Sequence, residues 1–449
     1  MHRNVCTLFL LLATAGLTGC APSYDSSSLD EHNSIARSPD LDGISVQRVW
    51  SQDQLPIPMP AGGFQIHDID VGTGLSIFIR GEDFTMLFDG GSGDDKAGID
   101  GERNSNRLLS YLFGALGPSG DAGCTPEGDQ FEPVDRPRLP IDHLVLSHAH
   151  DDHVSLLPDV LRCYSVGDVW EPGAVAETEI YEKFMHAVAA EHGIRYHTAA
   201  PPPADRTLVG FKSGTPLTIP YDIEWTQFVD YAADGQTYPL GWEGAASFAI
   251  LHADGRKYPD ANQNSVVVRV DLGAVSMLLV GDAESGERMD PMSAPGDVEK
   301  YLMDTYPRLI DVDIHQAGHH GSLSSNRDAF LRMVSPELVL IGAGPKRYGS
   351  VILPDAQVIA EYESLVGGPG NDPSLSIDNL APGQPVPQLL ENPRILRTDQ
   401  SDIYLSDETP ERSSYVSTGC LDYGGLPMDR IGNDDNQPGG CDNYVVLIP

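Results

Sequence analysis

The chain has 449 residues, of which 40% are hydrophobic, enough to bury a large core in one extended domain or in two domains. It carries 66 Asp and Glu against 28 Lys and Arg, a formal net charge of -38. This charge repels polyanions at long range and argues against a general nucleic-acid-binding surface, although a locally basic groove or a bound metal could override it. The composition fits a soluble protein outside the cytoplasm.

The N-terminus predicts a lipoprotein signal peptide. His2 and Arg3 precede an apolar run from about residue 5 to 17, which is too short to span a bilayer stably. The run closes on Leu-Thr-Gly-Cys, which resembles the bacterial lipobox. We therefore expect residues 1–19 to be removed and lipid on Cys20 to anchor the protein to a bacterial membrane, facing the periplasm or the cell surface. An ordinary signal peptide that happens to contain Cys20 is the alternative.

The remaining cysteines predict disulfides. Cys6 would leave with the signal peptide, and four others would stand in an oxidising compartment. Proximity in the sequence favours a Cys420–Cys441 pair, with Cys124–Cys163 as the second, but all three connectivities remain open. None of the four stands in a C-x-x-C arrangement, so a thiolate zinc site is not expected.

Secondary-structure patterns begin after a polar N-terminal segment. Residues 20–60 are rich in Ser, Asp and Pro, and we expect a flexible tether. Apolar and polar residues then alternate over 64–88, which predicts two or three strands, and a helix is expected over 104–116. A Gly/Pro-rich loop follows over 117–140.

Strands and helices are mixed along the rest of the chain. Further helices are expected over 155–164, 177–194 and 355–366. Further strands are expected over 141–148, 168–173, 216–228, 245–255, 264–282, 311–322 and 335–344. The strand region 264–282 is predicted to be a hairpin that turns at Gly273. Such hairpins among helices predict a layered α/β fold. We expect one domain over 61–405 and a disulfide-containing extension over 406–449.

One short segment concentrates groups that bind metals. Residues 144–161 place three histidines and two aspartates between two apolar runs, in the order HAHDDH. His148 and His150 leave the end of a predicted strand two residues apart, so both can turn toward one point beyond the sheet edge. Asp152 and His153 follow at the start of a helix. Ligands with this spacing are typical of a dinuclear metal site, and a solvated polar loop is the alternative.

The H-x-H-x-D-H pattern is that of the metallo-β-lactamase fold. Over about residues 64–404 the chain resembles one subgroup, the hydrolase domain of ComEC-type DNA-uptake proteins and their stand-alone relatives. The segments that carry the resemblance are HDIDVGTGLSIFIRGEDFTMLFDGG, VGDVWEPGA, ILHADG, NQNSVVVRV, LLVGDAE, HQAGHHGSLSSN and RILRTDQSDIYL. The resemblance implies a four-layer αββα sandwich and a hydrolase.

The resemblance also implies metal ligands. His148 and His150 would bind the first ion, Asp152 and His153 the second, and Asp282 would bridge both. Asp282 follows an apolar run at a strand end, where a carboxylate is costly to bury unless a cation pairs with it. A plain turn aspartate is the alternative.

Four further residues complete the predicted site. His319 or His320 would complete the second metal group, and the other of the two would contact substrate, as would Ser322. Asp89 would orient a ligand histidine, with a simple Asp-Gly turn as the alternative.

One position departs from the wider fold. Asn262 and Asn264 stand where many members supply a third histidine to the first ion, so Asn264 is expected near the ligands. The first ion should then bind more weakly, or be Mn²⁺ rather than Zn²⁺.

The expected activity is metal-assisted hydrolysis. Two divalent ions, Zn²⁺ or else Mn²⁺, would activate a water for attack on phosphorus or a carbonyl carbon. Asp152 would orient that water and accept a proton, and His319 or His320 would stabilise the developing oxyanion. The subgroup implies phosphodiesters, and the net charge favours small phosphodiesters or single-strand ends over long nucleic acid. A lactonase or β-lactamase, and a non-catalytic surface lipoprotein that keeps the fold, are the alternatives. Oligomeric state is left open.

Overall fold

The structure is a computed structural model, and its described residues all lie in one compact unit, Arg37–Pro449. It describes residues 43–49, 54–92, 106–120, 124, 133–134, 137–242, 244–344, 347–348, 351–366, 394–399, 403–404, 415–416 and 443–449. The predictions for Cys20, for the signal peptide and for a Cys420–Cys441 disulfide lie outside these residues.

The first of two large sheets is mixed and has nine strands, in the order β1-β22-β2-β3-β4-β5-β6-β7-β10. Their bounds are Ser45–Val49 (β1), Asn443–Ile448 (β22), Phe64–Asp68 (β2), Ile77–Arg80 (β3), Thr85–Phe88 (β4), Pro140–Val145 (β5), Ser165–Glu171 (β6), Arg195–Thr198 (β7) and Glu224–Gln227 (β10). The pairs from β1 to β4 are antiparallel, and those from β4 to β10 are parallel.

The second sheet has seven strands, in the order β11-β12-β13-β14-β15-β16-β19. Their bounds are Tyr238–Leu240 (β11), Ala246–His252 (β12), Val267–Leu272 (β13), Val275–Leu279 (β14), Ile314–Gln316 (β15), Leu338–Ile341 (β16) and Ile395–Arg397 (β19). The predicted hairpin is confirmed, because β13 and β14 pair antiparallel around Gly273. Three small two-stranded sheets join β8 to β9, β17 to β18 and β20 to β21, over Thr207–Leu208, Leu217–Thr218, Arg347–Tyr348, Val351–Ile352, Ile403–Tyr404 and Tyr415–Val416.

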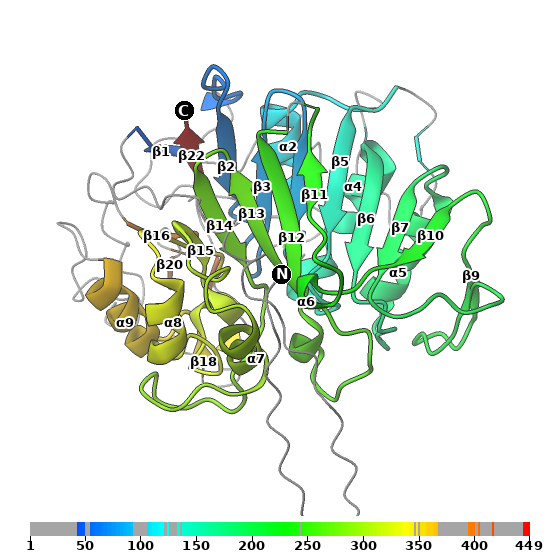
Figure 1. Cartoon of the computed structure of the whole chain (residues 1–449). Coiled ribbons are helices and arrows are strands. Elements are labelled where there is room, and N and C mark those ends of the chain that lie inside the picture. The colour runs from blue at the N-terminus through cyan, green and yellow to red at the C-terminus, as the bar shows by residue number, and fades with distance from the viewer. Residues whose placement is uncertain are drawn as a thin grey trace, which may run out of the picture. The chain divides into compact units, whose positions relative to one another are not determined.

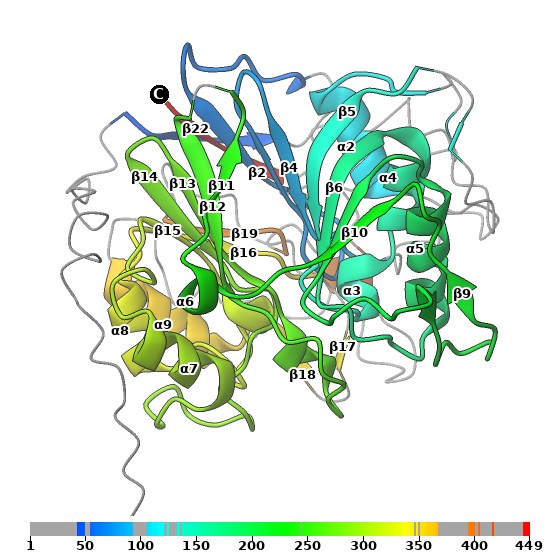
Figure 2. The ribbon, with the colours of Figure 1, turned by 45° about the vertical axis from the view of Figure 1, so that its right-hand side comes forward.

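Helices cover the outer face of each sheet (Figures 1 and 2). On the nine-stranded sheet these are α2 (Arg107–Ala115), α4 (Leu157–Cys163) and α5 (Glu179–Ala190), with the single turn α3 (Asp151–Val154) before α4. On the seven-stranded sheet they are α7 (Asp297–Thr305), α8 (Asp328–Val334) and α9 (Ala356–Val366). The short helices α6 (Tyr231–Asp234), η3 (Ala261–Asn264) and η4 (Gly318–Gly321) lie in connections.

Local signals fix where two of these helices begin. The side chain of Asn106 accepts a hydrogen bond from the Leu109 N–H at the start of α2, and Thr178 does the same for Tyr181 at the start of α5. Each cap satisfies a backbone N–H that has no partner inside its helix, which is worth about 1 kcal/mol.

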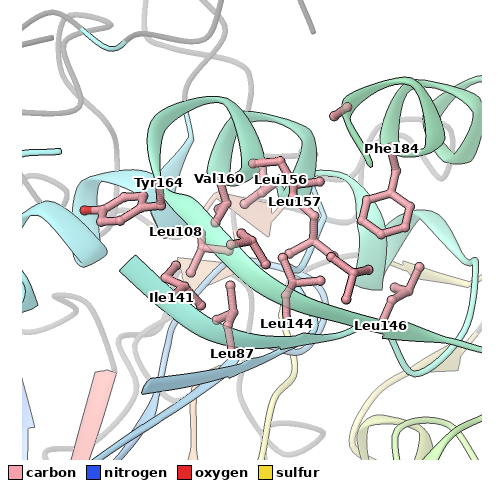
Figure 3. Packing of buried hydrophobic residues seen from close by; sticks show 14 of the residues in the cluster. Leu87, Leu108, Ile141, Leu144, Leu146, Leu156, Leu157, Val160, Tyr164 and Phe184 are labelled. Atoms are coloured by element: carbon pink, nitrogen blue, oxygen red, sulfur yellow. The ribbon is translucent and has the colours of Figure 1, made fainter. Parts of the chain in front are cut away.

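Three buried cores separate the layers. One lies between the two sheets and takes side chains from both, such as Ile66 and Val268. The second joins the nine-stranded sheet to its helices, and Figure 3 shows Leu87 and Leu144 of the sheet packed under Val160. The third joins the other sheet to α7, α8 and α9. Each fully buried aliphatic side chain contributes about 1.5–3 kcal/mol. The predicted four-layer αββα sandwich is confirmed.

The two ends of the described chain differ from expectation. Strand β22 lies between β1 and β2 and pairs with both, from Ser45↔Leu447 to Phe64↔Ile448. Residues 45–49, predicted as tether, and residues 443–448, predicted as extension, are therefore strands of the domain itself. Residues 45–49 are a short run next to a polar segment, and the apolar run over 444–448 was grouped with a turn-rich tail, because the sequence does not reveal that the two segments pair.

The predicted Cys124–Cys163 disulfide is present, with a Cα–Cα distance of 5.9 Å. It ties a residue of the loop that follows α2 to the last residue of α4. The two cysteines are 39 positions apart in the sequence, and a disulfide that closes such a loop stabilises a fold by restricting the unfolded chain. Of the helices formed by described residues, none combines the length and apolar character needed to cross a membrane.

A buried carboxyl in β2 gives a testable pH dependence. Both side-chain oxygens of Asp68 are buried and have no hydrogen-bond partner among the described residues. Burial, followed by the charge of Asp70, raises the pKa of Asp68 well above its ordinary value. The folded state therefore holds a proton that the unfolded state releases, and stability is lost as pH rises above about 4. We expect Asp68→Asn to raise the free energy of unfolding by at least about 1 kcal/mol at pH 8, with a smaller gain at pH 5.

Urea unfolding of both proteins across pH 5–8 checks this expectation. Asp70→Asn is the matched control, because Asp70 forms a buried ion pair with Arg107 at 2.9 Å and its removal should destabilise the fold. A difference between wild type and Asp68→Asn that is the same at every pH would contradict the prediction.

Candidate metal centre

The predicted ligands meet where strands of both sheets end. His148 follows β5, Asp282 follows β14, and His319 and His320 follow β15. The turn α3, which carries Asp152 and His153, lies at this end of the nine-stranded sheet (Figure 2). Buried strands fix the backbone on each side, so the loops between them present the side chains at defined positions.

Asp282 lies at the centre of the cluster and is 1% exposed. The Nε2 atom of His153 lies 3.2 Å from its Oδ1, and those of His320 and His148 lie 3.5 Å and 3.8 Å from its Oδ2. The ligand atoms fall into two groups that could each hold an ion. They are His148, His150 and Asp282 in the first, and Asp152, His153 and His320 in the second. Asp282 contacts both groups, as predicted for a bridging ligand.

Two histidines of the second group are held by hydrogen bonds through their outer nitrogens. His153 Nδ1 lies 2.7 Å from Asp89 Oδ2, and His320 Nδ1 donates to the Gly342 carbonyl at 2.7 Å. A carbonyl only accepts, so Nδ1 of His320 carries a hydrogen and Nε2 faces the cluster. Asp89 lies where it was predicted to lie, and such outer partners fix the orientation of metal-binding histidines.

The first group is held in the same way. His148 Nδ1 contacts Ser147 Oγ at 3.0 Å, and Ser147 Oγ in turn donates to Asp89. His148 Nε2 and His150 Nδ1 lie 3.0 Å apart, so these two atoms face one point. The other nitrogen of His150 lies 3.9 Å from Asp260 Oδ1.

The inward atoms of the cluster fit a cation. His153 Nε2, His320 Nε2 and Asp282 Oδ1 are buried and have no hydrogen-bond partner among the described residues. An unpaired buried polar atom costs about 1–3 kcal/mol, and three of them aimed at one site indicate a missing partner. Imidazole nitrogens and carboxylate oxygens are ligands for Zn²⁺ and Mn²⁺.

Charges within the cluster keep two central ligands in their binding forms. Burial, His153 and His150 hold the pKa of His148 well below its ordinary value, so the ring is neutral. Burial alone would raise the pKa of Asp282, but His153 and His320 bring it well below the ordinary value. Neutral imidazole and ionised carboxylate are the states that bind metal.

The structure distinguishes His319 from His320. His320 is buried and belongs to the second group, whereas the side chain of His319 is 23% exposed. His319 Nδ1 contacts Glu284 Oε1 and Ser324 Oγ, both at 2.8 Å, and its Nε2 lies 3.7 Å from Asp282 Oδ2. Both histidines have left-handed backbone, with φ of 47° and 54°, a strained state that occurs at functional sites. His320 is thus the better ligand, and His319 lies at the mouth of the site.

Carboxylates set the charge of His319. Burial would lower the pKa of this ring, but Asp282 and Glu284 raise it to about 9. Glu284 was not predicted from the sequence, and its only signal is its place two residues after Asp282.

Two predicted residues have supporting positions. Ser322 is buried, and its hydroxyl accepts a hydrogen bond from Arg288 at 2.9 Å. It also lies 2.9 Å from the Ser324 hydroxyl, behind His319, and its contact with substrate stays a prediction. Asn264 donates to the carbonyls of Asp254 and Arg256 at 2.5 Å and 2.6 Å and holds the loop after β12.

Two other residues adjoin the site. Asn262 Nδ2 lies 3.5 Å from His319 Nδ1, and its Oδ1 is buried without a hydrogen-bond partner among the described residues. Tyr348, from the β17–β18 hairpin, donates its hydroxyl to Asp152 Oδ2 at 2.5 Å. No sequence signal placed Tyr348 near the site, because the contact joins residues 196 positions apart.

Comparison with known proteins agrees with this site. The model of the metallo-β-lactamase superfamily matches residues 121–344. ComE operon protein 3 of Bacillus subtilis strain 168 is 24% identical over 204 residues, which cover 45% of this chain and 20% of that protein. Recombination protein 2 of Haemophilus influenzae is 26% identical over 187 residues, or 40% of this chain and 21% of that protein. The chain thus spans about a fifth of the length of these relatives.

Solved structures with a similar fold include the metallo-β-lactamase fold protein YhfI from Bacillus subtilis and the short form of human tRNase Z. YhfI is 12% identical with a TM-score of 0.34, and the match covers 68% of this chain and 94% of that one. The tRNase is 13% identical with a TM-score of 0.33, and the match covers 63% and 92%. The family match over the metal-binding segments and the αββα layers agree, and the chain therefore contains a metallo-β-lactamase superfamily domain.

Proposed function

We propose that the protein is a metal-dependent phosphodiesterase that holds two divalent cations on either side of Asp282. The observation that carries the proposal is the convergence of three histidine Nε2 atoms on the two oxygens of this one buried carboxylate. When bound, the cations would polarise the substrate and activate a water for attack. Zn²⁺ fits the donor set. Mn²⁺ fits the first group, His148, His150 and Asp282, because the third histidine that many members of the fold supply to this group is replaced by asparagine here.

The chain's own side chains would position these partners. Tyr348 holds Asp152 from outside, and Glu284 holds His319 with Nε2 turned inward. An imidazolium N–H at the mouth is suited to donate to a developing negative charge on a departing oxygen.

Two observations guide the choice of substrate, and the second favours small phosphodiesters over long DNA. A relative named for recombination, Recombination protein 2, favours a phosphodiester substrate. Basic residues in the loops around the site are each paired with a carboxylate: Arg256 with Asp254, Lys257 with Glu177 and Arg288 with Asp355. Among the described side chains of these loops, such pairing leaves little free positive charge for a long polyanion, and the net charge of -38 opposes one further.

A metal-supplemented substrate screen tests the proposed activity. Protein stripped with a chelator and resupplied with Zn²⁺ or Mn²⁺ would be offered bis(4-nitrophenyl) phosphate, short single-stranded DNA, a lactone and a β-lactam. We expect hydrolysis of the phosphate diester that needs the added metal. Opening of the lactone or β-lactam without phosphodiester hydrolysis would make this a carbon–oxygen or carbon–nitrogen hydrolase. Protein that takes up no metal would fit a non-catalytic lipoprotein instead.

We also propose that lipid on Cys20 holds the protein at a bacterial membrane, in the periplasm or at the cell surface. The Leu-Thr-Gly-Cys motif and the Cys124–Cys163 disulfide support this location, because disulfides persist in oxidising compartments. We expect Cys20→Ser to move the protein from the membrane to the soluble fraction of fractionated cells. Unchanged membrane association of the variant would refute the anchor.

A further inference from the structure

A cavity lies at the opposite end of the strands from the metal centre. It has a volume of about 410 Å³ and is lined by residues of the β3–β4 turn, of β5, β6 and β7, and of β11 with the turn that follows it. One lining residue, His143, stands in β5 before the strand reaches His148 at the metal centre. We call this cavity the far-end pocket.

The pocket arises because the two sheets have different widths. Strand β11 is an edge of the seven-stranded sheet and faces β6, with Tyr238 lying 4.6 Å from Trp170 between ring centroids. The nine-stranded sheet continues past this point through β7 and β10. Its inner face beyond β11 is therefore covered by no strand of the other sheet.

Aromatic rings line much of the pocket. Trp170 stacks on His197 at 3.8 Å with an interplanar angle of 14°, and Tyr238 meets Trp170 edge to face. Trp242 stands at the rim and is 93% exposed. Such full exposure of a tryptophan is costly, and an apolar group that settles against the indole would recover part of that cost.

The backbone of the turn at the rim is held in place, although the indole ring of Trp242 is exposed. Gly241 has φ of 72°, and a Cβ there would lie 2.2 Å from Asp83 Oδ1, so only glycine fits. The next N–H, that of Trp242, donates to Asp83 Oδ2 at 2.5 Å. Asp83 thus holds the turn that carries the rim tryptophan, and its carboxylate lines the same pocket.

The charge of the lining residues favours a cationic ligand over an anionic one. Three carboxylates, of Asp83, Asp142 and Asp168, face the pocket against the single guanidinium of Arg195. That guanidinium is held at two points by Asp168, with Nε 2.6 Å from Oδ1. The lining is therefore net acidic, and the net charge of -38 draws cations toward it and repels anions.

We propose that the far-end pocket binds a small organic cation, a substituted ammonium group held against Trp242 and Tyr238 and faced by the carboxylates. Aromatic faces and nearby carboxylates are the combination that recognises such cations, because ring faces carry negative potential. The volume suits a ligand of a few to about twenty heavy atoms. Binding here needs neither the metal centre nor hydrolysis.

Calorimetric titration of the full chain with choline chloride tests the proposal. The protein is stripped of metal with a chelator, and ionic strength is kept constant. We expect saturable binding in the millimolar range or tighter, and no saturable binding of glucose or inorganic phosphate. Trp242→Ala should weaken choline binding about tenfold, and Asp168→Asn should weaken it as well, because it leaves the Arg195 charge uncompensated.

Tyr221→Ala is the matched control. Tyr221 is another exposed aromatic, 83% exposed, and it lies near Arg206 outside the pocket lining. This variant should bind choline as the wild type does. The proposal is overturned if choline does not bind, if Trp242→Ala binds it equally well, or if glucose binds instead. These outcomes are independent of whether the protein hydrolyses phosphodiesters, because metal-free protein is used throughout.

Discussion

Replacing Asp282 by Ala should abolish metal-dependent phosphodiester hydrolysis, with a loss of at least about a thousandfold. Among the described residues, Asp282 is the one whose oxygens lie within 3.8 Å of inward nitrogens from both ligand groups. Without it the first group keeps only His148 and His150, so one of the two ions should be lost. The second group keeps Asp152 and two imidazoles and should retain its ion. Metal content by mass spectrometry, together with diesterase assays, measures both effects.

Asp260→Ala is the matched control for this result. Asp260 is a carboxylate at the same mouth, but it is half-exposed, accepts a hydrogen bond from the Asn262 N–H and approaches only the outer nitrogen of His150, at 3.9 Å. Its removal should leave both ions in place and change the rate by less than about tenfold. Retention of two ions by Asp282→Ala would refute the bridging role, whatever happens to the rate.

Replacing His320 should lower the metal content, whereas replacing His319 should leave the metal content unchanged. His320→Gln should lose the ion of the second group, since its Nε2 faces Asp152 and Asp282 at 3.5 Å each. His319→Gln should keep both ions and lower kcat by about a hundredfold, the typical contribution of a placed proton donor. Rates at saturating substrate, and metal content of the same samples, separate the two roles.

Glu284→Gln extends the same test to a positioning residue. Glu284 contacts His319 Nδ1 at 2.8 Å and does not belong to either ligand group. The variant should keep both ions, lower kcat less than His319→Gln does, and shift the alkaline limb of the kcat profile to lower pH, because the carboxylate no longer supports the imidazolium. If His319→Gln loses metal as His320→Gln does, the two roles have been assigned wrongly.

The sequence was sufficient for the part of the site that is local. His148, His150, Asp152 and His153 lie within six residues at a strand end, so their spacing alone brings them together. Asp282 was placed by the family resemblance, and the cost of burying a carboxylate after an apolar strand agreed with that placement. The layered α/β fold followed from the mixture of hairpins and helices, and the family resemblance supplied the order of the layers.

Contacts between distant segments that the family resemblance does not supply could not be predicted. Two adjacent histidines, His319 and His320, look equivalent in the sequence, and they differ only because one meets Gly342 and the other meets Glu284. The contacts of Ser322 with Arg288 and Ser324 likewise do not follow from the sequence. For the two histidines the deciding partner belongs to another strand end or loop.

The place of β22 has a consequence for the order in which this protein can fold. The Asn443 side chain donates to the Val49 carbonyl, and these residues are 394 positions apart. During synthesis or export, β1 has no partner in its sheet until the segment 443–448 emerges, and β2 lacks one of its two neighbours. Contacts of such long range are slow to form. One sheet edge of the nascent chain therefore stays open to chaperones and to aggregation until residues 443–448 have been made.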